Sequence, residues 1–204
     1  MSQQAANEWD ARYVASASLF GEEPNAFLVR QRSRFRPGQR ALVVADGSGR
    51  HGAWLASLGL QVDAFDIAPE GDRQARRLDA RRGVQVNRQV CGWEDWPCWQ
   101  DYDHVVAIFI QFSAPDERTR LFARMAQALR TGGHLHLLGY SRKQLTFGTG
   151  GPKDVSRLYD TALLNQAFPT LRMLELSQYE AVLDEGSAHR GPSALIGYVG
   201  RRDA

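Results

Sequence analysis

A glycine-rich segment follows an apolar run and precedes a helical pattern, and its sequence is Asp46-Gly47-Ser48-Gly49-Arg50-His51-Gly52. The run before it, residues 40 to 45, is almost entirely apolar, which is typical of a strand covered on both faces of a parallel sheet. Glycine permits tight turns with positive φ and lets a ligand approach the backbone closely. The helix that follows begins with free N–H groups and a partial positive charge. This unit favours an open α/β sheet that binds a ligand at the carboxyl ends of its strands.

Strand and helix patterns alternate from about residue 38 onward. The apolar and alternating runs predict strands at 40–45, 61–66, 84–90, 103–110, 134–139, 171–183 and 193–199. Proline starts, glycine stops and helical spacing predict helices at 50–58, 69–82, 115–133 and 153–168. The last of these is expected to place Leu158, Tyr159, Ala162 and Leu163 on one face.

This order predicts an α/β fold with a doubly wound, mostly parallel seven-stranded sheet. The two consecutive strands at the end predict a hairpin that adds one antiparallel strand. Residues 1–36 are helical in character and are expected to cap the carboxyl edge of the sheet, with 37–204 forming the α/β core. With 204 residues in all, the chain is interpreted as one domain.

Composition narrows the class of protein further. Apolar residues make up 43% of the chain and the formal net charge is +2, so charge alone favours neither a nucleic-acid nor a membrane partner. No apolar run reaches the ~20 residues of a membrane helix, and the polar N-terminus is unlike a secretory signal. Cys91 and Cys98 are interpreted as reduced thiols of a cytoplasmic protein. His134 and His136 lack a third ligand at metal spacing, so no metal site is expected.

A carboxylate follows the glycine segment at the distance that a ribose requires. Asp66 ends the second predicted strand, about 20 residues after Gly47, where a carboxylate can accept hydrogen bonds from vicinal hydroxyls. The glycine spacing also satisfies the dinucleotide fingerprint, so the pattern predicts an adenosine-containing ligand of either kind. Asp46 favours a ligand with an ammonium group, since a carboxylate would repel a pyrophosphate. Tyr140 and Lys143 are three residues apart, which does not match the Tyr-x-x-x-Lys pair of short-chain reductases.

The chain resembles the class I S-adenosylmethionine-dependent methyltransferases, in particular the bacterial branch related to the tellurite-resistance and thiopurine methyltransferases. The resemblance spans nearly the whole chain. Its marks for the superfamily are the 46–52 loop and Asp66. The stretches FGEEPN (20–25) and GTGGP (148–152) are more specific to the branch. The resemblance also includes 9–13 (WDARY), 102–103 (YD), 108–112 (IFIQF), 129–133 (LRTGG), 139–140 (GY), 144–145 (QL) and 158–159 (LY).

The resemblance implies S-adenosylmethionine as cofactor. It implies that Asp46, Gly47, Ser48 and Gly49, together with Arg50, lie at the methionine end, that Asp66 holds the ribose and that Ile67 packs on the adenine. Gly92, Trp93 and Ile108 would complete the cofactor site. The family usually has an acidic residue where this chain has Gly92. Backbone groups, Glu94 or Asp95 are the alternatives for the adenine amine.

The expected reaction is methyl transfer to a small-molecule acceptor, possible acceptors including a thiol or a chalcogen. An in-line displacement depends mainly on alignment and on exclusion of water. No side chain stands out as a general base, so the catalytic residue is left open, with Gln111, Tyr140 and Gln144 as candidates. The acceptor side and its lid are expected to include Trp9, Tyr13, Phe20, Gln111, Phe112, Tyr140 and Thr149.

Several alternatives stay open at this level. Trp9, Tyr13 and Phe20 either close over the site or only attach the N-terminal helix to the core. The arginines between residues 73 and 82 form either a solvated helix surface or a basic contact face. The whole chain is alternatively an NAD(P)-dependent reductase on a Rossmann fold or a non-catalytic S-adenosylmethionine-binding module. The oligomeric state and the acceptor are not determined by the sequence.

Overall fold

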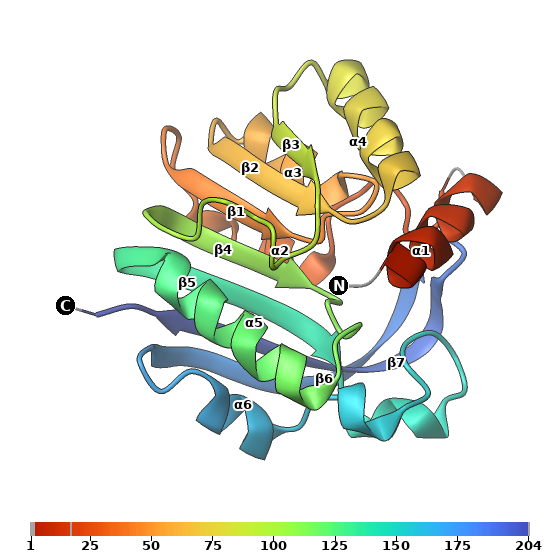
Figure 1. Ribbon diagram of the computed structural model, residues 1–204. Helices are drawn as coiled ribbons and strands as arrows, with labels where there is room; N and C mark the ends of the chain where they lie inside the picture. Colours follow the sequence, from red (N-terminus) through yellow and green to blue (C-terminus); the bar gives the residue numbers. More distant parts are fainter. Residues whose placement is uncertain (1–2, 17, 204) are drawn as a thin grey trace. The chain divides into compact units, whose positions relative to one another are not determined.

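The computed structural model describes residues 3–16 and 18–203 (Figure 1). The strands form a seven-stranded sheet with the order β3-β2-β1-β4-β5-β7-β6. The mostly parallel mixed sheet with a C-terminal antiparallel hairpin confirms the expected fold class. The described residues fall into two compact units, one from the N-terminal region to Pro97 with Glu185–Ala188, and one with Cys98–Asp184 and the C-terminal strand. The expectation of a single domain stays a prediction.

The first unit contains three parallel strands with their connecting helices. Its elements are α1 (Gln3–Ala15), α2 (Ala26–Arg30), the 3-10 helix η1 (Arg32–Arg34), β1 (Arg40–Val44), α3 (Arg50–Ser57), β2 (Gln61–Asp66), α4 (Pro69–Arg82) and β3 (Asn87–Val90). β1 pairs with β2 from Arg40↔Gln61 to Val44↔Phe65, and β2 pairs with β3 from Asp63↔Asn87 to Asp66↔Val90. The carboxyl ends of β1 and β2 therefore lie together.

Local sequence explains the bounds of α4. Pro69 occupies the first turn, where its missing N–H costs nothing, and Glu70 and Asp72 favour the positive end of the helix dipole. Gly83 ends the helix in the left-handed conformation. These signals were readable in the sequence, and the predicted helix 69–82 and strand 61–66 are confirmed.

The second unit contains the remaining strands. Its elements are β4 (Tyr102–Ile108), α5 (Pro115–Ala128), β5 (Leu129–Tyr140), the 3-10 helices η2 (Arg142–Thr146) and η3 (Val155–Arg157), α6 (Thr161–Ala167), β6 (Arg172–Glu185) and β7 (His189–Arg201). Every residue of β4 is buried, as expected for a strand covered on both faces. β4 and β5 are parallel, while β5 and β7 are antiparallel, from His134↔Arg201 to Tyr140↔Leu195. α5 packs on β4 and β5 (Figure 1).

The predicted helix 153–168 is wrong in its first half. Leu158 is extended, and the Tyr159 N–H donates to the carbonyl of Tyr140 at 3.1 Å, so both residues lie outside the helix. The helix begins only after Asp160, whose carboxylate accepts the N–H of Leu163 at 2.7 Å. Leu164, rather than Ala162 or Leu163, is the buried residue of α6.

Other bounds differ for a shared reason, since sheet pairing outweighs local pattern. The helix expected over 115–133 ends at Ala128, because Gly132 and Gly133 exchange backbone hydrogen bonds with Arg202. The third strand is shorter than 84–90 and spans Asn87–Val90, the residues that pair with β2. The fourth strand is Tyr102–Ile108 rather than 103–110, since Phe109 turns to φ 59°.

Candidate functional site

The glycine loop turns sharply between β1 and α3. Gly47 and Gly49 have φ of 57° and 90°, values that L side chains rarely adopt, and even Ala45 is at φ 52°. Gly49 is the N-cap of α3, and its N–H donates to the Asp46 carbonyl at 3.0 Å. A Cβ on Gly49 would lie 2.6 Å from the Cβ of Ala75 on α4. The loop is therefore held in one shape by packing of the protein against its glycines.

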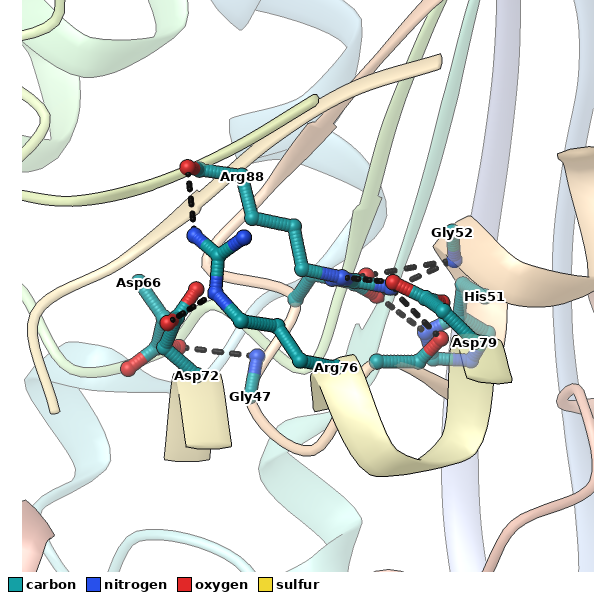
Figure 2. A network of polar contacts seen from close by, with 10 residues as sticks. Gly47, His51, Gly52, Asp66, Asp72, Arg76, Asp79 and Arg88 are labelled. Atoms are coloured by element: carbon teal, nitrogen blue, oxygen red, sulfur yellow. Dashed lines mark hydrogen bonds and ion pairs between the residues drawn. The ribbon is translucent and has the colours of Figure 1, made fainter. Parts of the chain in front are cut away.

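Asp66 lies beside this loop at the carboxyl end of β2. Its carboxylate accepts the N–H of Gly47 at 2.9 Å (Figure 2). It also accepts the N–H of Ala68 at 2.9 Å. Burial raises the pKa of Asp66 to about 6, although the backbone N–H groups of Ala68, Gly47 and Ile67 favour the ionised form. A carboxylate has about four lone-pair positions, so two backbone donors leave capacity for two hydroxyl groups.

Asp46 points into the protein. Its carboxylate lies 2.8 Å from Nη1 of Arg88 and accepts the N–H of Gly52 at 3.2 Å. Burial raises the pKa of Asp46, and the Arg88 guanidinium counters part of that effect. The guanidinium of Arg88 therefore stands where the sequence predicted the ammonium of a ligand. Sequence analysis missed this because Arg88 lies on β3, 42 residues away, and nothing in the local pattern links the two.

Arg50, at the first turn of α3, also forms an ion pair with a carboxylate of the protein. Its Nη1 lies 2.8 Å from Glu185, and Glu185 in turn accepts a 2.6 Å hydrogen bond from Nδ2 of Asn25. The side chain of Asn25 also accepts the N–H of Phe27 and caps α2. The FGEEPN stretch thus has a structural explanation, since its asparagine orders both α2 and the turn that carries Glu185.

The N-terminal helix covers the glycine loop. The hydroxyl of Tyr13 occupies the space that a Cβ on Gly47 would need, and its ring lies 3.1 Å from the corresponding position on Gly71. Tyr13 is buried, and its ring lies 6.5 Å from that of Trp9 and 6.0 Å from that of Phe20. Asp10 accepts the N–H of Glu70 and fastens α1 to the start of α4. Burial raises the pKa of Tyr13 well above its ordinary value, and the nearby charges of Asp66 and Asp46 add to this.

The remaining residues that were expected to bind the cofactor differ in burial. Ser48 and Ile67 are half-buried, while Gly92, Trp93 and Ile108 are buried. Cys91 follows β3, and its N–H donates to the carbonyl of Asp66 at 2.9 Å, which places the start of the 91–95 segment beside the sugar-binding candidate. Glu94 and Asp95 are exposed. Trp96 stacks on Phe65 with 5.3 Å between ring centroids.

The second unit carries the residues expected on the acceptor side. Gln111 does not have a free amide here, since its Nε2 donates to the carbonyls of Tyr140 and Arg157 at 2.9 and 3.0 Å, and its Oε1 accepts the Tyr140 N–H at 2.5 Å. Gln144 is used similarly by Thr149, Gly150 and the N–H of Ala194. The structure thus gives both glutamines a role in holding backbone, and their role as catalytic candidates stays a prediction.

An aromatic cluster lies at the end of β4, and it contains Tyr140, which the sequence placed on the acceptor side. Phe109 is a half-buried non-glycine residue at φ 59°, a conformation that costs energy and is enriched at functional sites. Its ring stacks on Tyr140 at 4.8 Å and meets His189 edge-on at 4.2 Å. Phe112 is also half-buried. No local signal predicted the backbone of Phe109, and only the aromatic run after the strand marks its position.

Within residues 3–16 and 18–203, no helix is long and apolar enough to cross a membrane. No group of three or more His, Cys, Asp or Glu side chains in this part of the chain is arranged to hold a metal ion. The basic residues of α4 have acidic neighbours, including Glu70 beside Arg73 at 2.6 Å and Asp72 beside Arg76 at 2.7 Å. That pairing is typical of a solvated helix surface.

Comparison with protein families and curated proteins gives a consistent result. Residues 41–133 match the model of a methyltransferase domain. A ubiquinone biosynthesis O-methyltransferase of Xanthomonas axonopodis pv. citri is 34% identical over 131 residues, which are 62% of this chain and 54% of that protein. A second, from Xanthomonas euvesicatoria pv. vesicatoria, is 34% identical over 59% of this chain and 52% of its own length. The chain thus spans about half the length of the curated relatives it matches.

Solved structures share the fold at low identity. The N-methyltransferase NodS from Bradyrhizobium japonicum, in complex with S-adenosyl-L-homocysteine, matches with a TM-score of 0.73 at 12% identity, covering 98% of each chain. TehB from Haemophilus influenzae matches with a TM-score of 0.73 at 14% identity, covering 88% of this chain and 63% of that one. At such identities these structures establish the fold alone.

The fold and the glycine loop define an open α/β sheet protein in which a carboxylate at the end of β2 lies beside the loop that precedes α3. The matched domain model and the named relatives thus show that residues 41–133 of this chain are similar to methyltransferase domains.

Proposed function

We propose that this protein binds S-adenosylmethionine on the 46–50 loop and Asp66 and transfers its methyl group to a small-molecule acceptor. The observation that carries the proposal is the 2.9 Å hydrogen bond between the Asp66 carboxylate and the N–H of Gly47. It joins the group suited to the ribose with the loop suited to the methionine end. A cytoplasmic location and a diffusible acceptor, rather than a nucleic acid, are part of the proposal.

The chemistry of the residues present fits this cofactor. The Asp66 carboxylate accepts hydrogen bonds from two neutral backbone N–H groups and retains acceptor positions for two sugar hydroxyls. The loop has no side chain at Gly47 or Gly49, and α3 offers N-terminal N–H groups and a partial positive charge to the carboxylate of an amino acid. When bound, S-adenosylmethionine supplies a methyl group on a positively charged sulfur. The tyrosine of α1 covers the loop, which helps to exclude water from this part of the site.

The proposed acceptor is a soft nucleophile such as a thiol or a chalcogen. A nucleophile of this kind needs alignment rather than a general base. The cluster of Phe109, Tyr140 and His189 supports this, because its aromatic faces suit an apolar or polarisable acceptor. The names of the relatives do not narrow the choice, since one is an O-methyltransferase and another an N-methyltransferase.

Two measurements test the proposal. Titration calorimetry with S-adenosylmethionine, S-adenosylhomocysteine and NADH is expected to show binding of the first two only. Release of S-adenosylhomocysteine is then followed with a panel of thiols, selenols, oxyanions, phenols and amines, where turnover with a thiol or a chalcogen is expected. Binding of NADH alone would favour the reductase. Cofactor binding with no turnover on any acceptor would favour the non-catalytic module, and turnover on phenols or amines only would exclude the soft acceptor.

A further inference from the structure

The guanidinium of Arg88 lies in a buried cluster behind the glycine loop, where Figure 2 shows it among its partners. Its Nε and Nη2 donate to the two carboxylate oxygens of Asp79 on α4, at 2.6 and 2.9 Å. Its Nη1 donates to Asp46 at 2.8 Å, and its Nη2 also donates to the Gly49 carbonyl at 3.4 Å. One side chain of β3 therefore connects α4 to both ends of the 46–49 turn.

We infer that Arg88 is a positioning residue for cofactor binding, which holds the 46–52 loop in the shape that receives the methionine end. This inference rests on the proposed function and adds a residue that touches the loop from behind rather than the ligand. Asp46, in turn, acts as the attachment point of the loop.

The packing of the loop against Arg88 supports this role. A Cβ on Gly49 would lie 2.8 Å from Nη2 of Arg88, and a Cβ on Gly52 would meet the carboxylate of Asp46 and lie 3.2 Å from the same Nη2. The backbone thus approaches the guanidinium as closely as glycine allows. Asp46 also accepts the Gly52 N–H, so the ion pair fixes the first turn of α3 together with the loop.

The fork of an arginine is needed at this position because two carboxylates face it. Arg88 binds Asp79 with two parallel N–H groups and has a third N–H left for Asp46, a geometry that a lysine ammonium cannot reproduce. Without this cation, two buried carboxylates would repel each other.

The electrostatic surroundings of Asp46 involve every element packed against the loop. Arg88 comes from β3 and Asp79 from α4, and Nδ1 of His51 on α3 lies 3.9 Å away. The charge of Asp46 is also felt by Asp66 on β2 and by Tyr13 on α1. Arg88 is thus the cation in direct contact with both Asp46 and Asp79, and its loss would make the geometry of the loop depend on protonation of Asp46.

The test uses the full chain and S-adenosylhomocysteine as the probe. Calorimetry compares wild type with Arg88→Gln, Arg88→Lys and the double variant Arg88→Gln/Asp46→Asn, each at pH 6.5 and pH 8. Arg77→Gln, an exposed arginine of α4, is the matched control. Binding by the wild type tests the proposed function on its own, so a failure there is distinguished from a failure of the inference.

The dissociation constant of Arg88→Gln is expected to rise about tenfold or more at pH 8. The ratio of the Arg88→Gln dissociation constant to the wild-type one is expected to be smaller at pH 6.5, because protonation of Asp46 relieves its repulsion with Asp79. Arg88→Lys is expected to bind with intermediate affinity, and Asp46→Asn in the double variant to recover part of the loss. Wild-type affinity in folded Arg88→Gln would overturn the inference, as would the same loss at both pH values with no recovery in the double variant. If Arg88→Gln does not fold, wild-type affinity and pH dependence in Arg88→Lys would overturn it.

Discussion

The backbone N–H of Gly47 donates a hydrogen bond of 2.9 Å to the carboxylate of Asp66, so the ends of β1 and β2 share one polar contact. Gly47 begins the turn and Asp66 ends the neighbouring strand in parallel register. A ligand with an amino acid at one end and a ribose further along would contact both groups.

Ionisation of Asp66 is expected to make stability depend on pH. Burial raises the pKa of Asp66 to about 6 in the folded chain, while an unfolded aspartate has a pKa of about 3.9. The folded state therefore holds this proton more tightly, and the resulting stabilisation is complete below about pH 4 and lost as pH rises through about 6. The contribution is about 3 kcal/mol, since one pKa unit corresponds to about 1.4 kcal/mol. Urea unfolding from pH 4 to pH 8 measures it, and Asp66→Asn is expected to remove this part of the slope. Identical slopes in variant and wild type would contradict the prediction.

The same shift predicts weaker cofactor binding in acid. Sugar hydroxyls donate to the ionised carboxylate, so protonation of Asp66 competes with the ligand as pH falls below about 6. The affinity for S-adenosylhomocysteine is expected to fall by up to about tenfold per pH unit there. Calorimetry between pH 5 and pH 8 checks this. Asp63→Asn, on the same strand and paired with Arg40, is expected to keep the wild-type profile.

A side chain at position 47 should disturb both the loop and the helix above it. Gly47→Ala places a Cβ at the hydroxyl of Tyr13 and forces alanine into φ 57°. The left-handed conformation alone costs about 1 kcal/mol or more, and the steric overlap adds to that. Gly83→Ala is the matched control, since Gly83 has φ 62° and a Cβ there would meet no atom of the described residues within 4 Å. Thermal unfolding is expected to show a larger loss for Gly47→Ala, partly recovered by Tyr13→Phe. Equal losses at the two glycines would show that Tyr13 does not fill this space.

Gln111 is expected to matter for stability more than for chemistry. Gln111→Ala removes partners from the N–H and carbonyl of Tyr140, which are tied to it at 2.5 and 2.9 Å. The Tyr140 carbonyl keeps the hydrogen bond from the Tyr159 N–H, but leaving the buried Tyr140 N–H without a partner costs about 1–3 kcal/mol. Urea unfolding measures the loss, with the exposed Gln127→Ala as a control that should change stability by less than about 0.5 kcal/mol. A stable Gln111→Ala with a large loss of turnover would instead support Gln111 as a catalytic residue.

If the acceptor is a soft nucleophile, turnover should tolerate the loss of the Tyr140 hydroxyl or of the His189 imidazole. Tyr140→Phe keeps the stacking on Phe109 and removes only the hydroxyl. His189→Gln removes the imidazole ring and its edge-on contact with Phe109 but keeps a polar side chain. Turnover with the acceptor found in the panel is expected to fall by less than about tenfold, because alignment rather than proton transfer limits the reaction. A loss of about 100-fold or more in either variant would show that a general base is required.

The sequence predicted the parts of the fold that local signals define. The 69–82 helix has Pro69 at its start and Gly83 past its end, so both bounds could be read directly. The helix expected over 153–168 failed because Tyr159 pairs with the backbone of β5, a contact between segments distant in sequence. The same limit applies to the end of α5, where Leu129 pairs with Tyr102 of β4 and Gly132 and Gly133 pair with Arg202.

In the candidate site, too, the sequence predicts the features that lie in one stretch of chain and not the contacts between distant segments. The glycine loop and Asp66 follow from a strand–loop–helix pattern in one stretch of chain. The partner of Asp46 could not be predicted, since Arg88 reaches it from another strand and charge pairing has no sequence period. The same holds for the commitment of Gln111 and Gln144 to backbone groups, because only the folded chain shows which loops they hold.

The most direct test of the central claim is the affinity of wild type and Asp66→Ala for S-adenosylhomocysteine, measured by calorimetry at pH 7.5. The wild type is expected to bind, and the variant to lose about tenfold or more of that affinity while remaining folded by circular dichroism. Absence of binding by the wild type, or equal affinity in the variant, would contradict the assignment of this loop and carboxylate to the cofactor.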